Sequence, residues 1–476
     1  MKFALIHYDV NRIANEPGNK TVMKHFGHMP NIQLLYVAAI LEQLDVELQY
    51  YDIVGMHLSI GEIEERLKIW QPDIIALSVF TSHLHNAKSY AERFKTLLPQ
   101  TKIMVGGVHM WIYPTQTLEF HSCFDYGVVG EAEMVLPEFI QRWKSNESFK
   151  GLRGLVWRDG DMVKYAGPPD LNTKLDDVPF PARHLVPNEV YFNFISSYQN
   201  YTVANTSRGC PYGCIFCEAA RSKWRARSAA NIVAEFEECY EKFAIQEIDI
   251  FDSSFTVNKK RVLEMCQLLI DKGLNKKMVW DVRSRVDTVD EEMLDALKEA
   301  GCYRIFYGIE SANPDILLNL RKEIDLARIE HIIKKTDKVG ISAFGYFLIG
   351  SPGETTNTAR QTIDFAKKLP LDFAIFNVLT AFPDTELYKK YYLPFTQHDF
   401  WDDHIRRPEP IENLMGRPWT KIIDDELKSI AHRAMLEYYL RPLQIYRALR
   451  SVKSTSQMYR YLTAGLDMVI SYWIGN

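Results

Sequence analysis

The chain has 476 residues and a mass of 55.3 kDa, which is too much for one ordinary hydrophobic core and predicts two or three domains. Its hydrophobic content of 47% and charged content of 25% are those of a folded globular protein and exclude a disordered chain. The net charge of -5 gives no reason to expect nucleic acid as a partner. Seven cysteines without a disulfide framework, and the lack of a signal peptide at the start, predict a reducing cytoplasm.

Short apolar runs alternate with helical patterns over the first 145 residues. The expected strands are 2–8, 47–52, 74–79 and 102–105, and the expected helices are 34–44, 60–70 and 86–98. This alternation predicts an α/β domain with a parallel sheet and crossover helices. Ligands of such sheets bind beyond the carboxyl ends of the strands, so the candidate contact loops are 78–83, 106–111 and 130–131.

Residues 146–195 are expected to form a linker, because glycine and proline interrupt any long element there. One short hairpin is predicted within it, since Asp159-Gly160 separates two alternating runs at 155–158 and 162–165.

Six segments between residues 196 and 390 repeat the order strand, polar loop, helix. The expected strands are 201–206, 248–252, 278–283, 304–310, 343–349 and 373–379. Six β/α units predict a partial barrel, whose chemistry lies at the carboxyl ends of its strands.

The first strand of this barrel leads into three cysteines, Cys210, Cys214 and Cys217, spaced C-x3-C-x2-C. Pro211 and Gly213 supply turn chemistry that lets the thiolates converge on one metal centre. Three ligands on a four-iron cluster would leave one iron open to a substrate. A zinc knuckle with a distant fourth ligand, or three incidental cysteines, are the alternatives. Three of the other cysteines, Cys239, Cys266 and Cys302, are expected to be packed thiols, and Cys123 has no obvious partner.

The cysteine spacing, with an aromatic residue directly before the last cysteine, resembles the radical S-adenosylmethionine (SAM) superfamily. The resemblance implies that the three cysteines hold a [4Fe-4S] cluster whose open iron binds SAM. It also implies SAM contacts from further residues: Phe216, Arg285, Glu310, Ser311 and Gly350. For Arg285 and Glu310 the alternative is a role in ion pairs inside the barrel.

Four segments of the first domain resemble the cobalamin-binding domain that precedes the radical SAM domain in one large subfamily: 30–41, 73–81, 105–109 and 126–131. The resemblance implies a Rossmann-like cobalamin-binding domain over residues 1–145. The implied contacts are Ser78, Thr81, Gly106, Gly107, His109, Gly130 and Glu131. Paired glycines after a strand can also be turn residues only. The Asp-x-His-x-x-Gly motif that places a histidine on cobalt is absent, although residues 9–12 stand where it would begin, so the lower axial ligand is left open.

Residues 391–476 form the predicted C-terminal helical region, with helices over 424–439, 442–451 and 458–474. The resemblance implies that these helices cap the barrel and shape the substrate pocket. The charges from Arg441 to Arg460 are all basic, and the apolar run that follows is too short to cross a bilayer. An ordinary docked helix is expected, with peripheral membrane contact as the alternative.

Taken together, the resemblance implies a cobalamin-dependent radical SAM enzyme that methylates an unactivated carbon of a small-molecule or lipid-like substrate, through a 5'-deoxyadenosyl radical and methylcobalamin. The expected partner is a one-electron reductant such as flavodoxin or ferredoxin. An oxidative cyclase or ring-rearranging enzyme with the same cofactors is the alternative, and a non-catalytic corrinoid- or metal-binding regulatory protein is the remote one. A methylthiotransferase is disfavoured because only Cys123 precedes Cys210. The sequence specifies neither the substrate nor a catalytic residue beyond these contacts.

Overall fold

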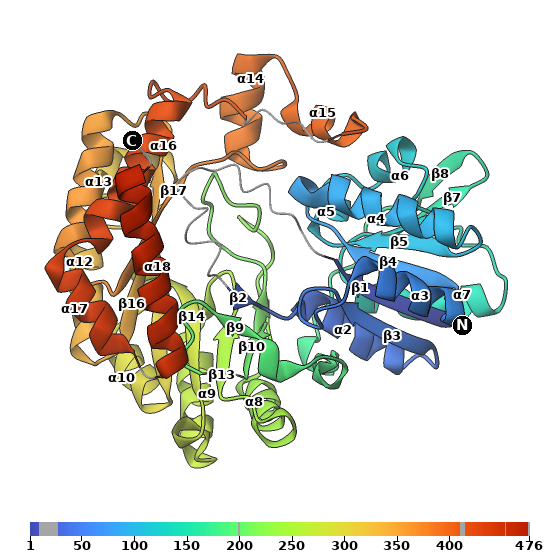
Figure 1. Cartoon of the computed structure of the whole chain (residues 1–476), viewed down its shortest axis with the longest axis horizontal. Helices are drawn as coiled ribbons and strands as arrows, with labels where there is room; N and C mark the ends of the chain where they lie inside the picture. Colours follow the sequence, from blue (N-terminus) through green and yellow to red (C-terminus); the bar gives the residue numbers. More distant parts are fainter. Residues whose placement is uncertain (9–26, 199, 410–414, 453, 475–476) are drawn as a thin grey trace. The chain divides into compact units, whose positions relative to one another are not determined.

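The computed structural model describes residues 1–8, 27–198, 200–409, 415–452 and 454–474, which form two compact units (Figure 1). Among these residues, the first unit comprises 1–8, 30–187 and 399–409, and the second comprises 27–29, 188–398 and 415–474. The division differs from the expected boundaries in three places. Residues 27–29 belong to the second unit, although they were expected in the first domain. Most of the expected linker belongs to the first unit, and so does a short segment of the expected C-terminal region.

The first unit is built on a seven-stranded sheet in the order β3-β1-β4-β5-β6-β7-β8. The first five strands in this order run parallel, as the sequence predicts, and β7 and β8 are antiparallel. The strands are β1 (Lys2–His7), β3 (Glu47–Asp52), β4 (Ile74–Ser78), β5 (Lys102–Gly106), β6 (Tyr126–Val128), β7 (Leu155–Asp159) and β8 (Met162–Tyr165).

The predicted hairpin is present, but it extends the sheet instead of connecting two domains. Strand β7 pairs with β6, with Val128 opposite Leu155, and Leu155 and Val156 are fully buried. Edge pairing of this kind hides apolar side chains that a free linker would leave in water. This pairing explains why the expected linker belongs to the first unit.

The helices of the first unit cover its sheet and keep the apolar strands from water. They are α2 (Ile32–Glu42), α3 (Ile60–Trp70), α4 (Leu84–Leu97), α5 (Val108–Ile112), α6 (Gln116–Phe120), α7 (Leu136–Lys144) and α15 (Phe400–Arg406). Helix α3 begins with a capping box, in which Ser59 and Glu62 satisfy each other's backbone N–H groups. Its buried face presents Ile63 and Leu67 to the core.

The second unit contains the predicted partial barrel. Its six strands are all parallel and follow the order of the chain: β10 (Tyr201–Ala204), β13 (Glu247–Ile250), β14 (Val279–Arg285), β15 (Cys302–Glu310), β16 (Ser342–Ile349) and β17 (Phe373–Val378). Five helices cover the outer face of this curled sheet (Figure 1): α8 (Ala229–Phe243), α9 (Lys259–Asp271), α10 (Glu291–Glu299), α12 (Leu326–Lys338) and α13 (Thr356–Lys368).

Side chains alternate between the two faces of the barrel strands. Trp280 and Val282 of β14 belong to the apolar core that the strands share with the outer helices. The alternate residues Asp281 and Arg283 face inward, where Asp281 lies 3.5 Å from Arg304 of β15. The barrel interior is therefore partly charged, unlike its outer core.

The remaining elements of the second unit are short strands and the C-terminal helices. They are β2 (Gly27–His28), β9 (Phe192–Asn193), β11 (Ser207–Arg208), β12 (Arg225–Ala226), α11 (Pro314–Asn319), α14 (Leu393–Thr396), α16 (Asp424–Tyr439), α17 (Pro442–Ser451) and α18 (Thr455–Ile474). The predicted C-terminal helical region is confirmed, and α16 is tied to the barrel by a bond from the Tyr438 hydroxyl to the Leu371 carbonyl, at 2.7 Å. Over the described ranges, no helix has the length and apolar character needed to cross a bilayer.

Three histidines hold α15 within the first unit by donating to backbone carbonyls. The Nε2 atoms of His85 and His121 lie 2.8 Å from the carbonyl oxygens of His404 and Ile405, respectively. The Nε2 atom of His404 lies 3.2 Å from the carbonyl oxygen of Thr81. Because a carbonyl only accepts, each Nε2 carries the proton. Burial lowers the pKa of both His121 and His404 to about 4, with nearby histidines and Lys88 adding to the effect.

We predict that the first unit loses stability as the pH falls from about 6.5 to about 4. The unfolded histidines take up protons first, because their pKa is near 6.5, whereas the folded His121 resists protonation until about pH 4. The free energy of unfolding should therefore drop by about 1.4 kcal/mol per pH unit for each such histidine. Urea unfolding over this range should show a shallower pH slope in His121→Gln, whose amide donates to Ile405 without titrating.

The control is His184→Gln, because His184 is half exposed and pairs with Glu42. Its slope should match that of the original protein. Equal slopes in all three proteins would contradict this account.

Candidate functional site

The turn that leads from β10 into the cysteine loop is fixed by one buried carboxylate. Asp252, just after β13, accepts from the backbone N–H groups of Thr206 and Ser207 at 2.7 and 3.0 Å and from the hydroxyl groups of both residues. Gly209 follows with a φ of +83°, and a Cβ there would lie 2.4 Å from the carbonyl oxygen of Lys223. Only glycine fits this close approach, so the loop starts in a defined direction.

The three cysteines lie together beyond the carboxyl end of β10 as free thiols. Cys210 and Cys214 are 8% exposed, and Cys217 is half-buried. Burial raises the pKa of the Cys210 and Cys217 thiols, and the neighbouring Cys214 raises both further. Arg285 and Lys322 act in the opposite direction on Cys210. The loop therefore places three mutually interacting thiols beside two cations.

The donor set is of the kind that iron–sulfur clusters use. Within the described ranges, no three His, Cys, Asp or Glu side chains surround one point closely enough to hold one ion. Thiolates of a four-iron cluster bind different irons and can stand further apart. A set of three cysteines would leave one iron without a protein ligand.

Arg285, at the end of β14, reaches the cysteine loop directly. Its Nη1 lies 3.5 Å from the sulfur of Cys214, and its guanidinium carbon lies 4.2 Å from the ring centroid of Tyr212. Asp287 holds the guanidinium through two bonds of 2.8 and 2.9 Å. A third bond of 3.1 Å runs to the carbonyl of Lys322. The fork of Arg285 is thus pre-oriented toward the loop, and an ion pair is part of how it is held.

Glu310 and Lys322 form a buried ion pair of 2.9 Å at the carboxyl end of β15. A Cβ at residue 308 would lie 2.6 Å from Glu310 Oε1 and 2.7 Å from Lys322 Nζ, so Gly308 leaves the room that the pair needs. Glu310 itself has a φ of +68°, an uncommon backbone conformation for a residue other than glycine. Lys322 lies in a connecting loop without a motif and was not predicted from the sequence.

Ser311 and Gly350 lie in tightly bonded turns. The Ser311 hydroxyl oxygen is buried and accepts from the Asn313 backbone N–H at 3.1 Å. Gly350 has a φ of +87°, donates to Glu354 and accepts from the Trp419 indole at 2.7 Å. Burial raises the pKa of Glu354 to about 7. Phe216 is half-buried next to Cys217.

The expected cobalamin contacts gather at one edge of the first unit's sheet. Ser78 and Gly106 are opposite each other at the carboxyl ends of β4 and β5. Gly107 has a φ of +99°, and a Cβ there would lie 2.7 Å from the Val79 carbonyl oxygen, so packing demands glycine. A Cβ on Gly106 would make only an ordinary van der Waals contact of 3.9 Å with Val128. The fold therefore does not require glycine at this position, unlike at Gly107.

His109 belongs to this edge but is fully buried. Its Nδ1 lies 3.1 Å from the Thr81 hydroxyl, and its Nε2 lies 2.9 Å from the Thr117 hydroxyl. Burial lowers the pKa of His109 to about 3, so the ring is neutral. His109 thus fixes the position of Thr81. Residues 9–12, where a cobalt-binding histidine motif would begin, lie outside the described residues.

Gly130 and Glu131, after β6, complete the set of expected contacts. Gly130 has a φ of +83°, and a Cβ there would lie 2.8 Å from the ring of Pro169. The Glu131 carboxylate accepts from the Asn172 backbone N–H at 2.8 Å. Both residues therefore also hold the chain that follows β8 against this edge.

Four exposed apolar side chains in these loops were not singled out from the sequence. Phe80, Val108, Trp111 and Met134 follow β4, β5 and β6 and are 55%, 41%, 46% and 39% exposed, respectively. The loops of the first three were expected contacts, whereas Met134 lies three residues beyond the expected loop 130–131. An apolar residue within or near a polar loop was the available signal. Together they give this edge an apolar surface of the kind that marks a ligand site.

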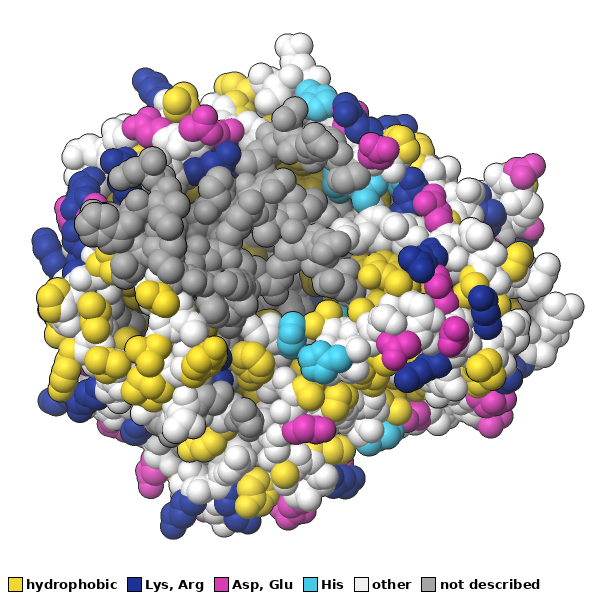
Figure 2. Space-filling model, in the orientation of Figure 1, with side chains coloured by type: hydrophobic (Ala, Val, Ile, Leu, Met, Phe, Trp, Pro, Cys, Tyr) yellow, Lys and Arg dark blue, Asp and Glu magenta, His cyan; other side chains and the backbone are white. Residues whose placement is uncertain are grey.

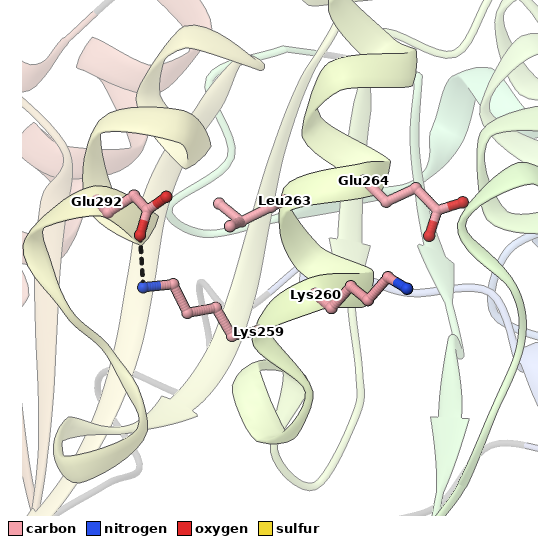
Figure 3. Close-up of a pocket in the computed structure, with 5 residues that line it drawn as sticks. All are labelled: Lys259, Lys260, Leu263, Glu264 and Glu292. Atoms are coloured by element: carbon pink, nitrogen blue, oxygen red, sulfur yellow. Dashed lines mark ion pairs between the residues drawn. The ribbon is translucent and has the colours of Figure 1, made fainter.

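A separate groove lies on the outside of the barrel between α9 and α10 (Figure 3). Lys259 pairs with Glu292 at 2.6 Å, and Leu263 lines the groove between the two helices. The side chains of Lys260 and Glu264 extend to the side away from Glu292. An exposed ion pair of this kind is ordinary surface chemistry.

Two family models match the chain. The model of the Radical SAM superfamily matches residues 204–366, and the model of the B12 binding domain matches residues 20–140. The first range contains the three cysteines and the expected SAM contacts, and the second contains the expected cobalamin contacts.

Similar proteins cover most of the chain. An uncharacterized methyltransferase of Pyrococcus horikoshii is 30% identical over 87% of this chain and 88% of the relative. The anaerobic magnesium-protoporphyrin IX monomethyl ester cyclase of Cereibacter sphaeroides is 26% identical over 76% of this chain and 60% of the relative. The structure of the radical SAM methyltransferase TsrM from Kitasatospora setae, with cobalamin and a [4Fe-4S] cluster bound, matches with a TM-score of 0.65 and 17% identity, over 81% of this chain and 73% of that one.

We predict that Gly106→Ala weakens cobalamin binding, whereas Gly107→Ala lowers the melting temperature. Gly106→Ala should melt like the original protein but bind cobalamin at least about tenfold more weakly, because its methyl group enters the ligand space. Gly107→Ala should lower the melting temperature, because its Cβ meets backbone at 2.7 Å. Equilibrium dialysis of cobalamin and thermal melts of the ligand-free proteins measure the two effects. Unchanged cobalamin binding in Gly106→Ala would contradict the placement of the ligand.

Proposed function

We propose that this chain, which belongs to the radical SAM superfamily and carries a B12-binding domain, methylates an unactivated carbon of a small-molecule substrate. The observation that carries the proposal is the presence of two sites in one chain. One is a loop of three free thiols, and the other is a glycine-containing edge with exposed apolar side chains. The relative from Pyrococcus horikoshii, which spans nearly the same length, is itself named a methyltransferase.

In this proposal Cys210, Cys214 and Cys217 hold a [4Fe-4S] cluster, and SAM binds the iron that has no protein ligand. When bound, the cluster and SAM supply a radical that abstracts a substrate hydrogen, and cobalamin supplies the methyl group. A small one-electron carrier protein such as flavodoxin or ferredoxin is the proposed reductant.

The role of Arg285 follows from its fixed position. Its guanidinium lies 3.5 Å from the Cys214 sulfur, where a positive charge stabilises the thiolate that a metal requires. The two bonds to Asp287 keep the fork in place, so no reorganisation is needed when an anionic group arrives. We assign Arg285 to the carboxylate of SAM on this basis.

Glu310 and Lys322 are assigned to the polar portion of SAM. The Glu310 carboxylate accepts hydrogen bonds and can receive an ammonium group. The Lys322 ammonium group donates hydrogen bonds and can bind the oxygen of a hydroxyl group. Phe216 and the turns at Ser311 and Gly350 complete this assignment. The backbone groups of the turns at Ser311 and Gly350 can form hydrogen bonds with the adenine and the ribose of SAM. The edge of the Phe216 ring can contact the flat adenine.

The cobalamin assignment rests on the edge of the first unit. The backbone at Ser78, Gly106 and Gly107 would face the nucleotide tail, because this part of the edge has no side chain in the way. Thr81, held by His109, offers a hydroxyl group, and Gly130 and Glu131 are assigned to the far side of the edge. Phe80, Val108 and Trp111 would pack against the apolar ring system.

A second candidate function keeps the cofactors and omits methyl transfer. The observation in its favour is the similarity to the anaerobic magnesium-protoporphyrin IX monomethyl ester cyclase of Cereibacter sphaeroides. The mass of the product distinguishes the two, because only a methyltransferase adds a methyl group from SAM.

We predict that Cys214→Ala abolishes reductive SAM cleavage, with a loss of roughly a hundredfold or more, because two thiolates cannot hold the cluster. The measurement is the anaerobic release of 5'-deoxyadenosine by reconstituted protein with a strong chemical reductant. Cys239→Ala is the matched control, since Cys239 is a fully buried packing thiol in the outer core of the barrel unit. SAM cleavage by Cys214→Ala at the original rate would refute the cluster assignment.

Methyl transfer is tested separately with SAM that carries a deuterated methyl group. Small molecules extracted from cells should contain one product that gains the label in the presence of the enzyme. If SAM is cleaved and a product forms without the label, the second candidate function replaces the first.

A further inference from the structure

The helix α17 presents its apolar residues to solvent and its polar residues to the protein. Leu443, Tyr446 and Leu449 are 59%, 60% and 48% exposed, whereas Gln444 is 2% exposed. Gln444 donates to the Asp372 carbonyl, and Arg447 pairs with Asp337 and Asp372 at 2.9 and 3.4 Å. This arrangement is the reverse of an ordinary docked helix, whose apolar stripe faces the core.

The helix α18 continues the same surface. Tyr459, Leu462 and Leu466 recur at intervals of three and four residues and are 59% exposed or more. The inner side of α18 carries Tyr461, whose ring centroid lies 5.3 Å from that of Phe194, and Arg460, which donates to the Phe194 carbonyl at 3.1 Å. Figure 2 shows hydrophobic side chains gathered where Figure 1 places these two helices. We call this surface, formed by Leu443, Ile445, Tyr446, Leu449, Tyr459, Leu462 and Leu466, the C-terminal apolar face.

The charged residues within the sequence of the C-terminal apolar face have one sign. The sequence from residue 438 to residue 466 contains no Asp or Glu, and its five charged residues are Arg441, Arg447, Arg450, Lys453 and Arg460. The whole chain, by contrast, has a net charge of -5. Apolar side chains among cations fit a surface that offers hydrocarbon and negative charge together.

A cavity of about 370 Å³ opens beside α17 at the amino ends of β15, β16 and β17. Four cations line it, namely Lys298, Arg304, Arg447 and Arg450, against two acids, Asp337 and Asp372. The Nε atom of Arg304 is buried there without a hydrogen-bond partner. Arg304 also pairs with Asp281, so the lining has one cation more than these three acids. This excess of positive charge suits a phosphate group.

We propose that the C-terminal apolar face docks on the surface of an anionic phospholipid membrane, with a headgroup phosphate in this cavity. A second copy of the chain is a poorer occupant, because a two-fold interface would bring the exposed Arg450 of both copies to one surface. The cysteine loop follows the carboxyl end of β10, whereas the cavity lies at the amino ends of the strands. Docking therefore leaves the cluster end of the barrel open. The docking proposal does not rest on the proposed function.

The test is flotation of the full chain with phosphatidylcholine vesicles that contain or lack phosphatidylglycerol. The protein should float with the anionic vesicles and not with the neutral ones, and added salt should weaken its binding. The double variant Leu443→Gln/Tyr446→Gln should bind at least about tenfold more weakly, and Arg450→Gln should bind several-fold more weakly. Ile69→Gln is the matched control, because Ile69 is an exposed apolar residue of α3 and should be replaceable without effect.

The variants should fold, because each replaced side chain is already exposed. Thermal melts check this. Equal flotation of the original protein and the double variant would overturn the proposal. So would a failure to float with anionic vesicles. A concentration-dependent dimer that the double variant abolishes would also overturn it, by assigning the face to a second copy.

Discussion

The buried carboxylate of Asp252 is the interaction on which the candidate site depends most. It binds the backbone and the hydroxyl groups of Thr206 and Ser207, and so fixes the turn between the first barrel strand and the cysteine loop. A loop of eight residues cannot hold three thiols in place by packing alone. Arg285 then reaches the loop from the end of β14 and also donates to the carbonyl of Lys322. The chemistry at this edge follows from a turn that is already rigid before any cofactor binds.

Close backbone approach is the second constraint, and it operates in both units. Gly107 makes room for the Val79 carbonyl at the edge of the first sheet, and Gly308 makes room for the Glu310 side chain and its lysine partner. In both places a Cβ would displace a group that the site needs. Gly106 differs, because a Cβ there would make only an ordinary van der Waals contact with Val128. The fold thus requires Gly107 and Gly308, whereas Gly106 is a position where a ligand could approach the backbone.

Local sequence patterns predicted most of the fold and the cysteine loop at the centre of the candidate site. Apolar runs of strand length predicted the sheets, and the cysteine spacing predicted the loop, because both depend on neighbours in sequence. What depends on distant partners was missed. The packing of residues 399–409 with the first unit relies on His85 and His121, more than 280 positions away, and no local signal marks it. Lys322 likewise becomes visible only once Glu310 is beside it.

The central claim is that three cysteines hold a four-iron cluster and leave one iron for SAM. Mössbauer spectroscopy of protein reconstituted anaerobically with isotopically enriched iron tests it most directly, because each iron contributes its own signal. The account predicts that the addition of SAM changes the signal of one iron in four and leaves the other three as they were. A spectrum that SAM leaves unchanged, or one without a four-iron cluster, would contradict it.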